Sequence, residues 1–355
     1  MLSDKLLSTS LHFPTSIGPD LFVWGTGSSG RLGLGDTLNR SSPVQLTGTW
    51  AKVSIEKGAH EAAIKPDGSL FVWGPNGNGY LGLGDVVTRS SPVQLAGTWA
   101  AVNLGTAFSS AMKTEGSLWM WGANTQGRLG LGDYIHRSSP VQLAGTWAMC
   151  RPGASHTGAI RPDGSLWMWS VGGSGELGQG DAIYRSSPVQ VAGTWVDVSA
   201  GANITGALKA DGSLWMWGFG NRGRLGLGDT VARSSPVQLA GTWTAVVLGQ
   251  GVQNLGLKAG GSLWAWGYNS FGRLGLGDTD DRSSPVQIAG TWVALTAGAA
   301  HSGALKADGS FFAWGRNVDG RLGLGDAIDR SSPIQVPGTW KSAFVGNGGN
   351  GGLRF

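Results

Sequence analysis

The stretch GRLGLGDTVARSSPVQLAGTW, residues 223–243, decides the fold because the chain repeats it. Almost the same letters stand at residues 127–147, 272–292 and 320–340, with most changes confined to the three letters between GLGD and RSSP. A fixed period of this kind is typical of solenoids and propellers. The tetrapeptide RSSP occurs seven times at steps of 48 or 49 residues, beginning at Arg40, Arg89, Arg137, Arg185, Arg233, Arg282 and Arg330.

One unit of this repeat predicts four short antiparallel strands. The letters Asp-Gly at 211–212 supply the positive φ angles of a tight hairpin, and no segment keeps a helical period over about ten residues. The pattern therefore predicts an all-β chain made of four-stranded propeller blades. In the unit that ends at Trp243, the expected strands are residues 196–201, 206–209, 213–218 and 235–241.

The third strand of each unit is apolar on both sides. In residues 213–218, Leu214 and Met216 point to one side of the sheet, while Trp215 and Trp217 point to the other. Such a strand has to be covered on both faces, as it is when one blade lies between two neighbours. A solenoid could provide the same cover, so the ends of the chain decide between the two architectures.

The chain ends favour a closed ring. Residues 343–355, AFVGNGGNGGLRF, align with the first two strands of a unit, and residues 19–25, PDLFVWG, begin directly with the third strand. The two half-units complete one blade, and joining them removes the exposed sheet edges that an open array would keep. We therefore expect a seven-bladed β-propeller over residues 17–355, closed by a blade that the amino- and carboxyl-terminal segments share, with residues 1–16 as a separate arm.

The repeat resembles that of the regulator of chromosome condensation family. The resemblance rests on DGSLWMWGFGNRGRLGLGD at residues 211–229 and on GASH and GAAH at 153–156 and 298–301, and its style is that of bacterial and phage members. It implies a seven-bladed propeller. Members of the family include a guanine-nucleotide exchange factor, a plant ultraviolet-B photoreceptor and secreted inhibitors of β-lactamases, so the fold does not fix the function.

This sequence differs in two ways from family members of known function, and both differences narrow the functions to be expected. The even spacing of the repeats leaves no room for the wedge that the exchange factor inserts into one blade. The photoreceptor places Trp in the Gly-x-x-His loop, whereas all 18 Trp of this chain occupy repeat positions of the framework. Light sensing is therefore not expected.

Composition and charge argue against several other kinds of protein and of site. The single cysteine, Cys150, allows no internal disulfide and no cysteine-based metal site. The formal charge of +4 is spread along the repeats, so no nucleic-acid partner is expected. No apolar run approaches the roughly 20 residues of a membrane span. The first residues, MLSDKLLSTSLHF, lack the apolar core of a secretion signal, which favours a cytoplasmic or virion-associated protein.

The histidines, glycine motifs and acidic residues that could form a catalytic or ligand site are better explained by structural roles. His60, His156 and His301 share one repeat position with Phe108 and Ile204, which is not the pattern of a ligand ring. Matches to G-x-G-x-x-G lack the following helix that a pyrophosphate needs, so no nucleotide cofactor is expected. The acidic letters DTDDR at 278–282 lack the ligand spacing of a calcium loop, and the Asp of each GLGD is expected to pair with an Arg or to cap loop amides. We expect no catalytic site, metal or cofactor.

Sequence diversity is confined to the loops on one face of the expected ring. In an antiparallel blade, the loops after the first and third strands lie on one face, and these loops differ from copy to copy. Neutral drift is one explanation, and a binding surface is the other, because exposed aromatic side chains favour recognition. The candidate binding residues on these loops are Tyr80, Phe108, Tyr134, His136, Tyr184, Phe219, Tyr268 and Phe271.

These observations predict a non-enzymatic propeller that presents its variable loops to a protein or glycan. A bacteriophage virion or a cell-surface adhesion structure would suit such a protein. The alternative is a cytoplasmic regulator of a small GTPase, similar to an exchange factor. Residues 1–16 match no part of the repeat, so they either tether the ring to a larger assembly or lie as a short tail on the propeller.

Overall fold

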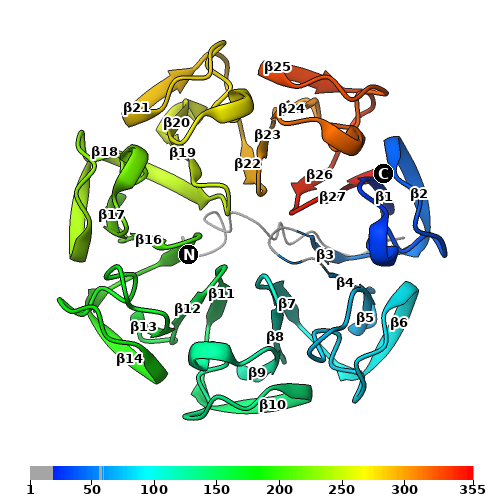
Figure 1. Cartoon of the computed structure of the whole chain (residues 1–355), viewed down its shortest axis with the longest axis horizontal. Helices are drawn as coiled ribbons and strands as arrows, with labels where there is room; N and C mark the ends of the chain where they lie inside the picture. The colour runs from blue at the N-terminus through cyan, green and yellow to red at the C-terminus, as the bar shows by residue number, and fades with distance from the viewer. Residues whose placement is uncertain (1–18, 56–57, 59, 355) are drawn as a thin grey trace.

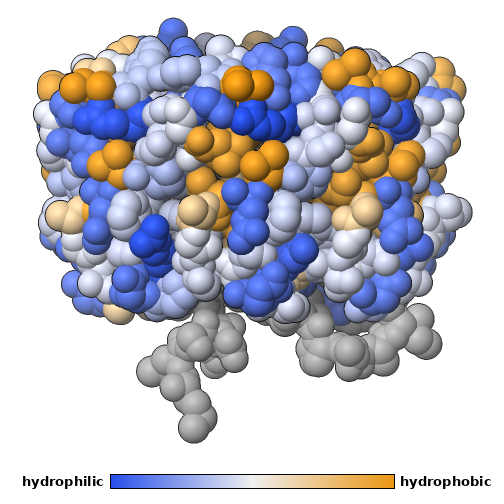
Figure 2. Space-filling view, turned by 90° about the horizontal axis from the view of Figure 1, so that it is seen from below, coloured by the Kyte–Doolittle hydropathy of each residue, from blue (hydrophilic) through white to orange (hydrophobic). Residues whose placement is uncertain are grey.

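The computed structural model describes residues 19–55, 58 and 60–354, which form a ring of seven four-stranded antiparallel blades. Figure 1 shows the ring along its axis, and Figure 2 shows it from the side. The four strands of each blade are called A to D from the axis outward. The seven-bladed propeller expected from the repeats is therefore confirmed.

The strands follow the predicted order in every unit. Blades 1 to 3 consist of β3(Lys52–Ser54), β4(Glu61–Ile64), β5(Ser69–Gly74) and β6(Arg89–Thr98); β7(Ala101–Leu104), β8(Phe108–Met112), β9(Ser117–Gly122) and β10(Arg137–Thr146); and β11(Met149–Pro152), β12(His156–Ile160), β13(Ser165–Ser170) and β14(Arg185–Thr194). Blades 4 to 6 consist of β15(Asp197–Ala200), β16(Ile204–Leu208), β17(Ser213–Gly218) and β18(Arg233–Leu248); β18, β19(Gln253–Lys258), β20(Leu263–Gly267) and β21(Arg282–Ile288); and β22(Ala294–Ala297), β23(His301–Leu305), β24(Phe311–Gly315) and β25(Arg330–Val336).

Strand β18 belongs to two blades. Its first part pairs with β17 as strand D of blade 4, and its second part, from Trp243 to Leu248, pairs with β19 as strand A of blade 5. The helical content is limited to short 3₁₀ turns, and no helix among the described residues is long and apolar enough to cross a membrane. These turns are η1(Ser28–Gly30), η2(Thr125–Gly127), η3(Asn221–Gly223), η4(Ala259–Gly261), η5(Ser270–Gly272) and η6(Val318–Gly320).

The seventh blade is shared by the two ends of the chain, as predicted. It contains β26(Ser342–Val345), β27(Gly349–Arg354), β1(Asp20–Gly25) and β2(Arg40–Thr49), and β1 lies between β27 and β2. Asp20 pairs with Arg354 and Gly25 with Gly349. The described ends of the chain therefore meet at one face of the ring. The arm predicted at residues 1–16 lies outside the described residues.

The GLGD and RSSP letters latch each blade to the next. Trp217 of blade 4 is fully buried, and its Nε1 donates a hydrogen bond of 2.8 Å to the carbonyl of Glu176 in blade 3. Gly178 has a φ of +70°, and a Cβ there would lie 2.9 Å from that Nε1; a Cβ on Gly175 would lie 2.5 Å from Cα of Ser234. Only glycine fits at these positions. The same tryptophan bond, 2.7–3.2 Å long, recurs at all seven blade junctions.

Strand C is covered on both faces, although not uniformly. Leu214, Met216 and Trp217 are fully buried, whereas Trp215 is half-buried near the outer edge of the blade. The ammonium of Lys209 lies 4.3 Å from the Trp215 ring centroid, and the indole donates to Oγ of Ser213. A cation from the end of strand B covers the corresponding aromatic ring in every blade.

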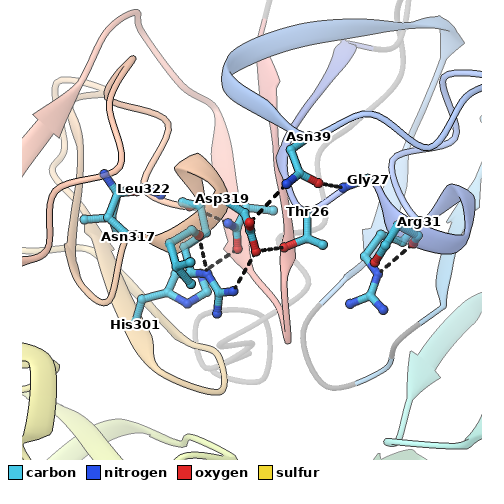
Figure 3. A network of polar contacts seen from close by, with 12 residues as sticks. Thr26, Gly27, Arg31, Asn39, His301, Asn317, Asp319 and Leu322 are labelled. Atoms are coloured by element: carbon cyan, nitrogen blue, oxygen red, sulfur yellow. Dashed lines mark hydrogen bonds and ion pairs between the residues drawn. The ribbon is translucent and has the colours of Figure 1, made fainter.

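The same latch closes the ring between blade 6 and the shared blade. Trp24 donates to the carbonyl of Arg321 at 3.1 Å. The carboxylate of Asp319 accepts hydrogen bonds from Oγ1 of Thr26 (3.1 Å) and Nδ2 of Asn39 (3.0 Å) (Figure 3). Asp319 therefore connects the last complete blade to the amino-terminal strands, which lie almost a whole chain away in sequence.

Candidate binding face

The two faces of the ring are defined by the register of the blades. In blade 4, Ala200 pairs with Thr205 and Gly218 pairs with Arg233, so the A–B and C–D loops emerge at the same end of the sheet. We call this end of the ring the variable face, because it carries the loops that differ between copies. The opposite end, with the B–C turns and the D–A corners, is the uniform face. The described chain ends lie at the uniform face.

The three variable letters between Asp and Arg form a clamped loop. In blade 4, Oδ1 of Asp229 accepts the N–H of Val231 at 3.0 Å. The guanidinium of Arg233 donates to the other oxygen of Asp229 at 2.6 Å and to the carbonyl of Val231 at 2.9 Å. The Val231 N–H and then Arg233 lower the pKa of Asp229, so the carboxylate stays ionised. The same Asp–Arg ion pair, 2.5–2.7 Å long, occurs in all seven copies.

The clamp directs the middle side chain of each loop into solvent. The middle residue is aliphatic in six copies and Asp280 in the seventh. We call the six aliphatic side chains the studs. Sequence reasoning missed them, although one aliphatic letter at a fixed place among changing letters was a readable signal. The studs, with their exposed fractions, are Leu38 (62%), Val87 (57%), Ile135 (64%), Ile183 (56%), Val231 (58%) and Ile328 (63%).

Four of the predicted binding residues are exposed on this face. Tyr134, Tyr184 and Phe271 have exposed fractions of 61%, 47% and 42%. His136 is also exposed, and its Nδ1 accepts the N–H of Asn124 at 2.8 Å, which fixes the ring. Tyr134, His136 and Tyr184 each adjoin a stud in sequence. These four side chains are available to a partner.

Three other predicted residues are half-buried between neighbouring loops. Tyr80 packs on the ring of His60 with centroids 5.5 Å apart, and Phe219 lies under the guanidinium of Arg224 at 5.0 Å. Tyr268 lies between two guanidinium groups, those of Arg222 at 4.1 Å and Arg273 at 4.7 Å. Each of them presents part of its ring to the variable face.

Phe108 does not belong to the binding surface, and this prediction was wrong. Its side chain is fully buried at the start of β8, the repeat position that holds histidine in other blades. The ring lies close to Gly105, and a Cβ on Gly105 would come within 2.3 Å of a ring carbon of Phe108. Only glycine therefore fits at position 105. Phe108 therefore fills the space that His156 fills in blade 3, and its loop position does not make it accessible.

Arginine residues that sequence reasoning did not single out line the loops of blades 4 to 6. The guanidinium of Arg316 lies 5.0 Å from the ring of Phe271, and Arg273 lies 5.8 Å from the same ring. Burial lowers the pKa of Arg273 to about 10, and the positive charges of Arg316 and Arg222 contribute to that lowering. The result is a stack of alternating arginine and aromatic side chains. It forms only in space, because its members come from three different repeats.

The repeat histidines are parts of the blade junctions. His60, His156 and His301 are fully buried, and each Nε2 contacts a polar side chain of the next blade at 2.7–2.8 Å. In the last case the acceptor is Oδ1 of Asn350, so His301 donates from Nε2. Burial lowers the pKa of His60 and of His301 to about 3, which keeps both rings neutral. These contacts agree with the structural role expected for this repeat position, because each histidine joins its blade to the next.

The acidic cluster at 278–282 is tied to neighbouring groups. Asp278 pairs with Arg282 at 2.5 Å, and Asp281 accepts the N–H of Asn269 at 2.9 Å and faces Arg222 at 3.5 Å. Within residues 19–55, 58 and 60–354, no three His, Cys, Asp or Glu side chains are placed to hold a metal ion.

Solved structures with this fold cover almost the whole chain. Human WBSCR16 has a TM-score of 0.84 at 21% identity, covering 95% of this chain and 98% of its own. Prp20p of Saccharomyces cerevisiae, in a study of its binding to Gsp1p and histones, has a TM-score of 0.85 at 20% identity, covering 96% and 93%. Yeast RCC1 (Prp20) bound to Kap60 has a TM-score of 0.86 at 19% identity, covering 100% and 91%.

Comparison with curated proteins finds no match to this sequence. The family model of the regulator of chromosome condensation (RCC1) repeat matches seven segments, residues 20–57, 67–112, 115–160, 163–208, 211–251, 260–305 and 308–349. These segments include strands of every blade and the latching loops between blades. The chain therefore belongs to the regulator of chromosome condensation (RCC1) repeat family.

Proposed function

We propose that this chain is a non-enzymatic binding protein that presents its variable face to a protein or glycan. The observation that carries the proposal is where its apolar surface lies. Among the described residues, ten of the thirteen large hydrophobic side chains that are exposed belong to the A–B or C–D loops of the variable face. Apolar patches gathered along one rim are typical of interaction surfaces. Figure 2 shows such patches along the upper edge, separated by polar surface.

The blade junctions make this face a rigid platform. Each junction combines the tryptophan bond with buried polar contacts, so the loops are held by both neighbours. A preformed surface loses little conformational entropy on binding, which supports affinity. The exposed aromatic side chains Tyr134, Tyr184 and Phe271 are the anchors that we propose for the partner.

Site-specific photocrosslinking tests the proposal directly. Tyr184→p-benzoylphenylalanine places the probe on the variable face, and Val293→p-benzoylphenylalanine places it on the uniform face at a residue of similar exposure, 53% against 47%. We expect crosslinked partner only from position 184 when the protein is illuminated in extracts of its source. Equal or greater yield from position 293 would place the binding surface elsewhere.

We also propose that residues 1–16 tether the ring to a larger assembly, such as a virion or an adhesion structure. The pairing of Asp20 with Arg354 supports this, because the first described residues of the chain enter the ring at the uniform face. A chain that lacks residues 1–14 should fold with an unchanged unfolding midpoint but separate from its assembly on a density gradient. Normal co-sedimentation of that chain would remove the tether from the proposal.

The second candidate function is nucleotide exchange on a small GTPase. It is favoured by the likeness to Prp20p, whose structure is described together with its binding to Gsp1p. The even spacing of the repeats counts against it, because it leaves no room for an inserted wedge. Release of a fluorescent GDP analogue from a panel of small GTPases separates the two candidate functions. Faster release at catalytic concentrations of the propeller would support nucleotide exchange. Unchanged release would leave the proposal of a binding protein.

A further inference from the structure

The studs are not required by the fold. Asp280 occupies the stud position of blade 5, and it makes the same clamp as the aliphatic residues. Its N–H bonds to Asp278 at 3.0 Å, and its carbonyl accepts from Arg282 at 2.9 Å. A polar side chain is therefore compatible with the loop. The letters on either side range from Thr and Ala to Tyr and Asp, yet the middle letter is Leu, Val or Ile in the other six copies.

Exposed aliphatic side chains at six equivalent places need a physical explanation. Each is more than half exposed, and together they present on the order of 400 Å² of apolar surface. A standard interface buries about 800 Å² per partner, slightly more than half of it apolar. The studs can thus supply the apolar area of one ordinary protein interface.

The chemistry around the studs favours a protein over a glycan. Aliphatic side chains offer no donors or acceptors to sugar hydroxyls. Each stud is flanked by an Asp and an Arg that pair with each other, as in Asp133–Arg137 at 2.5 Å. The clamp residues beside each stud are therefore neutral as a pair and add no net charge to a contact between studs.

The geometry of the ring indicates which protein surface fits. The blades are arranged around one axis (Figure 1), and the studs occupy the same repeat position in six of them, so we expect the studs to lie at a similar distance from that axis. A set of points at one radius meets an identical set when two rings stack face to face on a common axis. A compact partner of another shape would cover neighbouring blades and leave the remaining studs in water.

We propose that the variable face binds a second copy of this chain, with the two stud rings in contact. This inference rests on the proposed function, since it assumes that the variable face is the binding face. It adds the partner and the residues that form the contact. Asp280 is the one weak point of the ring, because a carboxylate loses hydration in an apolar interface. Any other partner of this face then competes with self-association.

Analytical ultracentrifugation of the full chain over a concentration series tests the inference. We expect a monomer–dimer equilibrium in the wild type. Ile135→Asp combined with Ile183→Asp should weaken the dimer at least about tenfold, because two adjacent studs become charged. Asp280→Ile should strengthen it several-fold. The control, Val293→Asp on the uniform face, should leave the equilibrium unchanged. Since Asp280 shows that the clamp accepts a carboxylate, the stud variants should keep the wild-type unfolding midpoint.

The possible outcomes separate this inference from the proposed function. A wild-type chain that stays monomeric at every concentration overturns the inference, and so does a dimer that Val293→Asp breaks and the stud variants do not. A monomeric protein that still crosslinks to another protein through position 184 would refute the second copy and retain the variable face as the binding face. A dimer through the uniform face together with crosslinks from position 293 would refute both.

Discussion

Glu61 departs from the repeat pattern, and its buried carboxyl makes the stability of the fold depend on pH. In the other six copies, this position holds Ser, Thr or Asn, which donates to a loop carbonyl of the preceding blade, as Thr205 does to Glu176 at 2.8 Å. Glu61 is only 2% exposed, and its Oε2 has no hydrogen-bond partner among the described residues. Burial raises its pKa well above the ordinary 4.5, against the opposing effect of Arg31.

A carboxyl with a raised pKa destabilises the fold at high pH. Its protonated form is favoured in the ring, so the contribution is complete below 4.5 and is lost as the pH rises through the folded-state pKa. We expect Glu61→Gln, which keeps the size and supplies a permanent donor, to raise the unfolding midpoint at mildly alkaline pH. The gain should shrink toward pH 4.5. A gain of equal size at both ends of a pH series of thermal melts would show that Glu61 does not titrate in this way.

At the scale of the strand, the two tryptophans of strand C have different roles. Trp217 is fully buried at the junction with the preceding blade, while Trp215 is half-buried beneath Lys209. The alternation of apolar letters predicted that both sides of the strand are covered. It could not predict that one side is covered by a neighbouring blade and the other partly by a lysine.

This difference predicts unequal costs of truncation. Trp217→Ala should lower the free energy of unfolding by about 3–5 kcal/mol, because it leaves a cavity between blades and removes the bond to Glu176. Trp215→Ala should cost about 1–2 kcal/mol, since its ring is only partly buried and is covered on one side by Lys209 rather than by a neighbouring blade. Urea titrations followed by circular dichroism measure both. Equal costs, or a free energy of unfolding for Trp217→Ala equal to that of the wild type, would contradict the assignment of the junction.

At the scale of the whole molecule, the ring depends on a blade made from both chain ends. Strand β1 pairs with β27 along its full length, and Asp319 ties blade 6 to Thr26 and Asn39. Closure in this way leaves neither β1 nor β27 as an unpaired edge, because each lies between two other strands of the blade. Closure therefore contributes to the stability of every other junction.

Removing the carboxyl-terminal half of the shared blade should open the ring. A chain without residues 341–355 loses β26 and β27, which exposes Leu21 and Trp24 to water. We expect loss of the cooperative thermal transition and a red shift of tryptophan fluorescence. A circular permutant that joins residue 354 to residue 19 through a short linker, with new ends in the turn at 210–213, is the control and should fold. A truncated chain that melts like the wild type would refute closure through this blade.

The architecture could be predicted from the sequence because each repeat of 48 or 49 residues corresponds to one blade. The strand order, the shared blade, the framework tryptophans and the division into two faces all follow from comparing one repeat with the next. The site was only partly predictable. Phe108 was assigned to the surface because it adjoins a loop, although its backbone position directs it into the junction. The constant aliphatic letter of the studs was readable in the sequence, but its exposure follows from the clamp of hydrogen bonds. The arginine–aromatic stack depends on contacts between repeats and is not visible in a single unit.

The constant letters build the ring, and the third clamped letter supports the loop in several copies, as Asn39 does for Gly27, while the first two clamped letters are free for binding. The most direct test replaces the first two clamped letters in all seven loops, from residues 37–38 to residues 327–328, by Ser-Ser while keeping every third letter and every flanking Asp and Arg. The measurement is the thermal unfolding midpoint of the resulting chain. We expect a cooperative transition with a midpoint close to that of the wild type. A chain that fails to fold, or that loses its cooperative transition, would show that these letters belong to the framework and would contradict the claim.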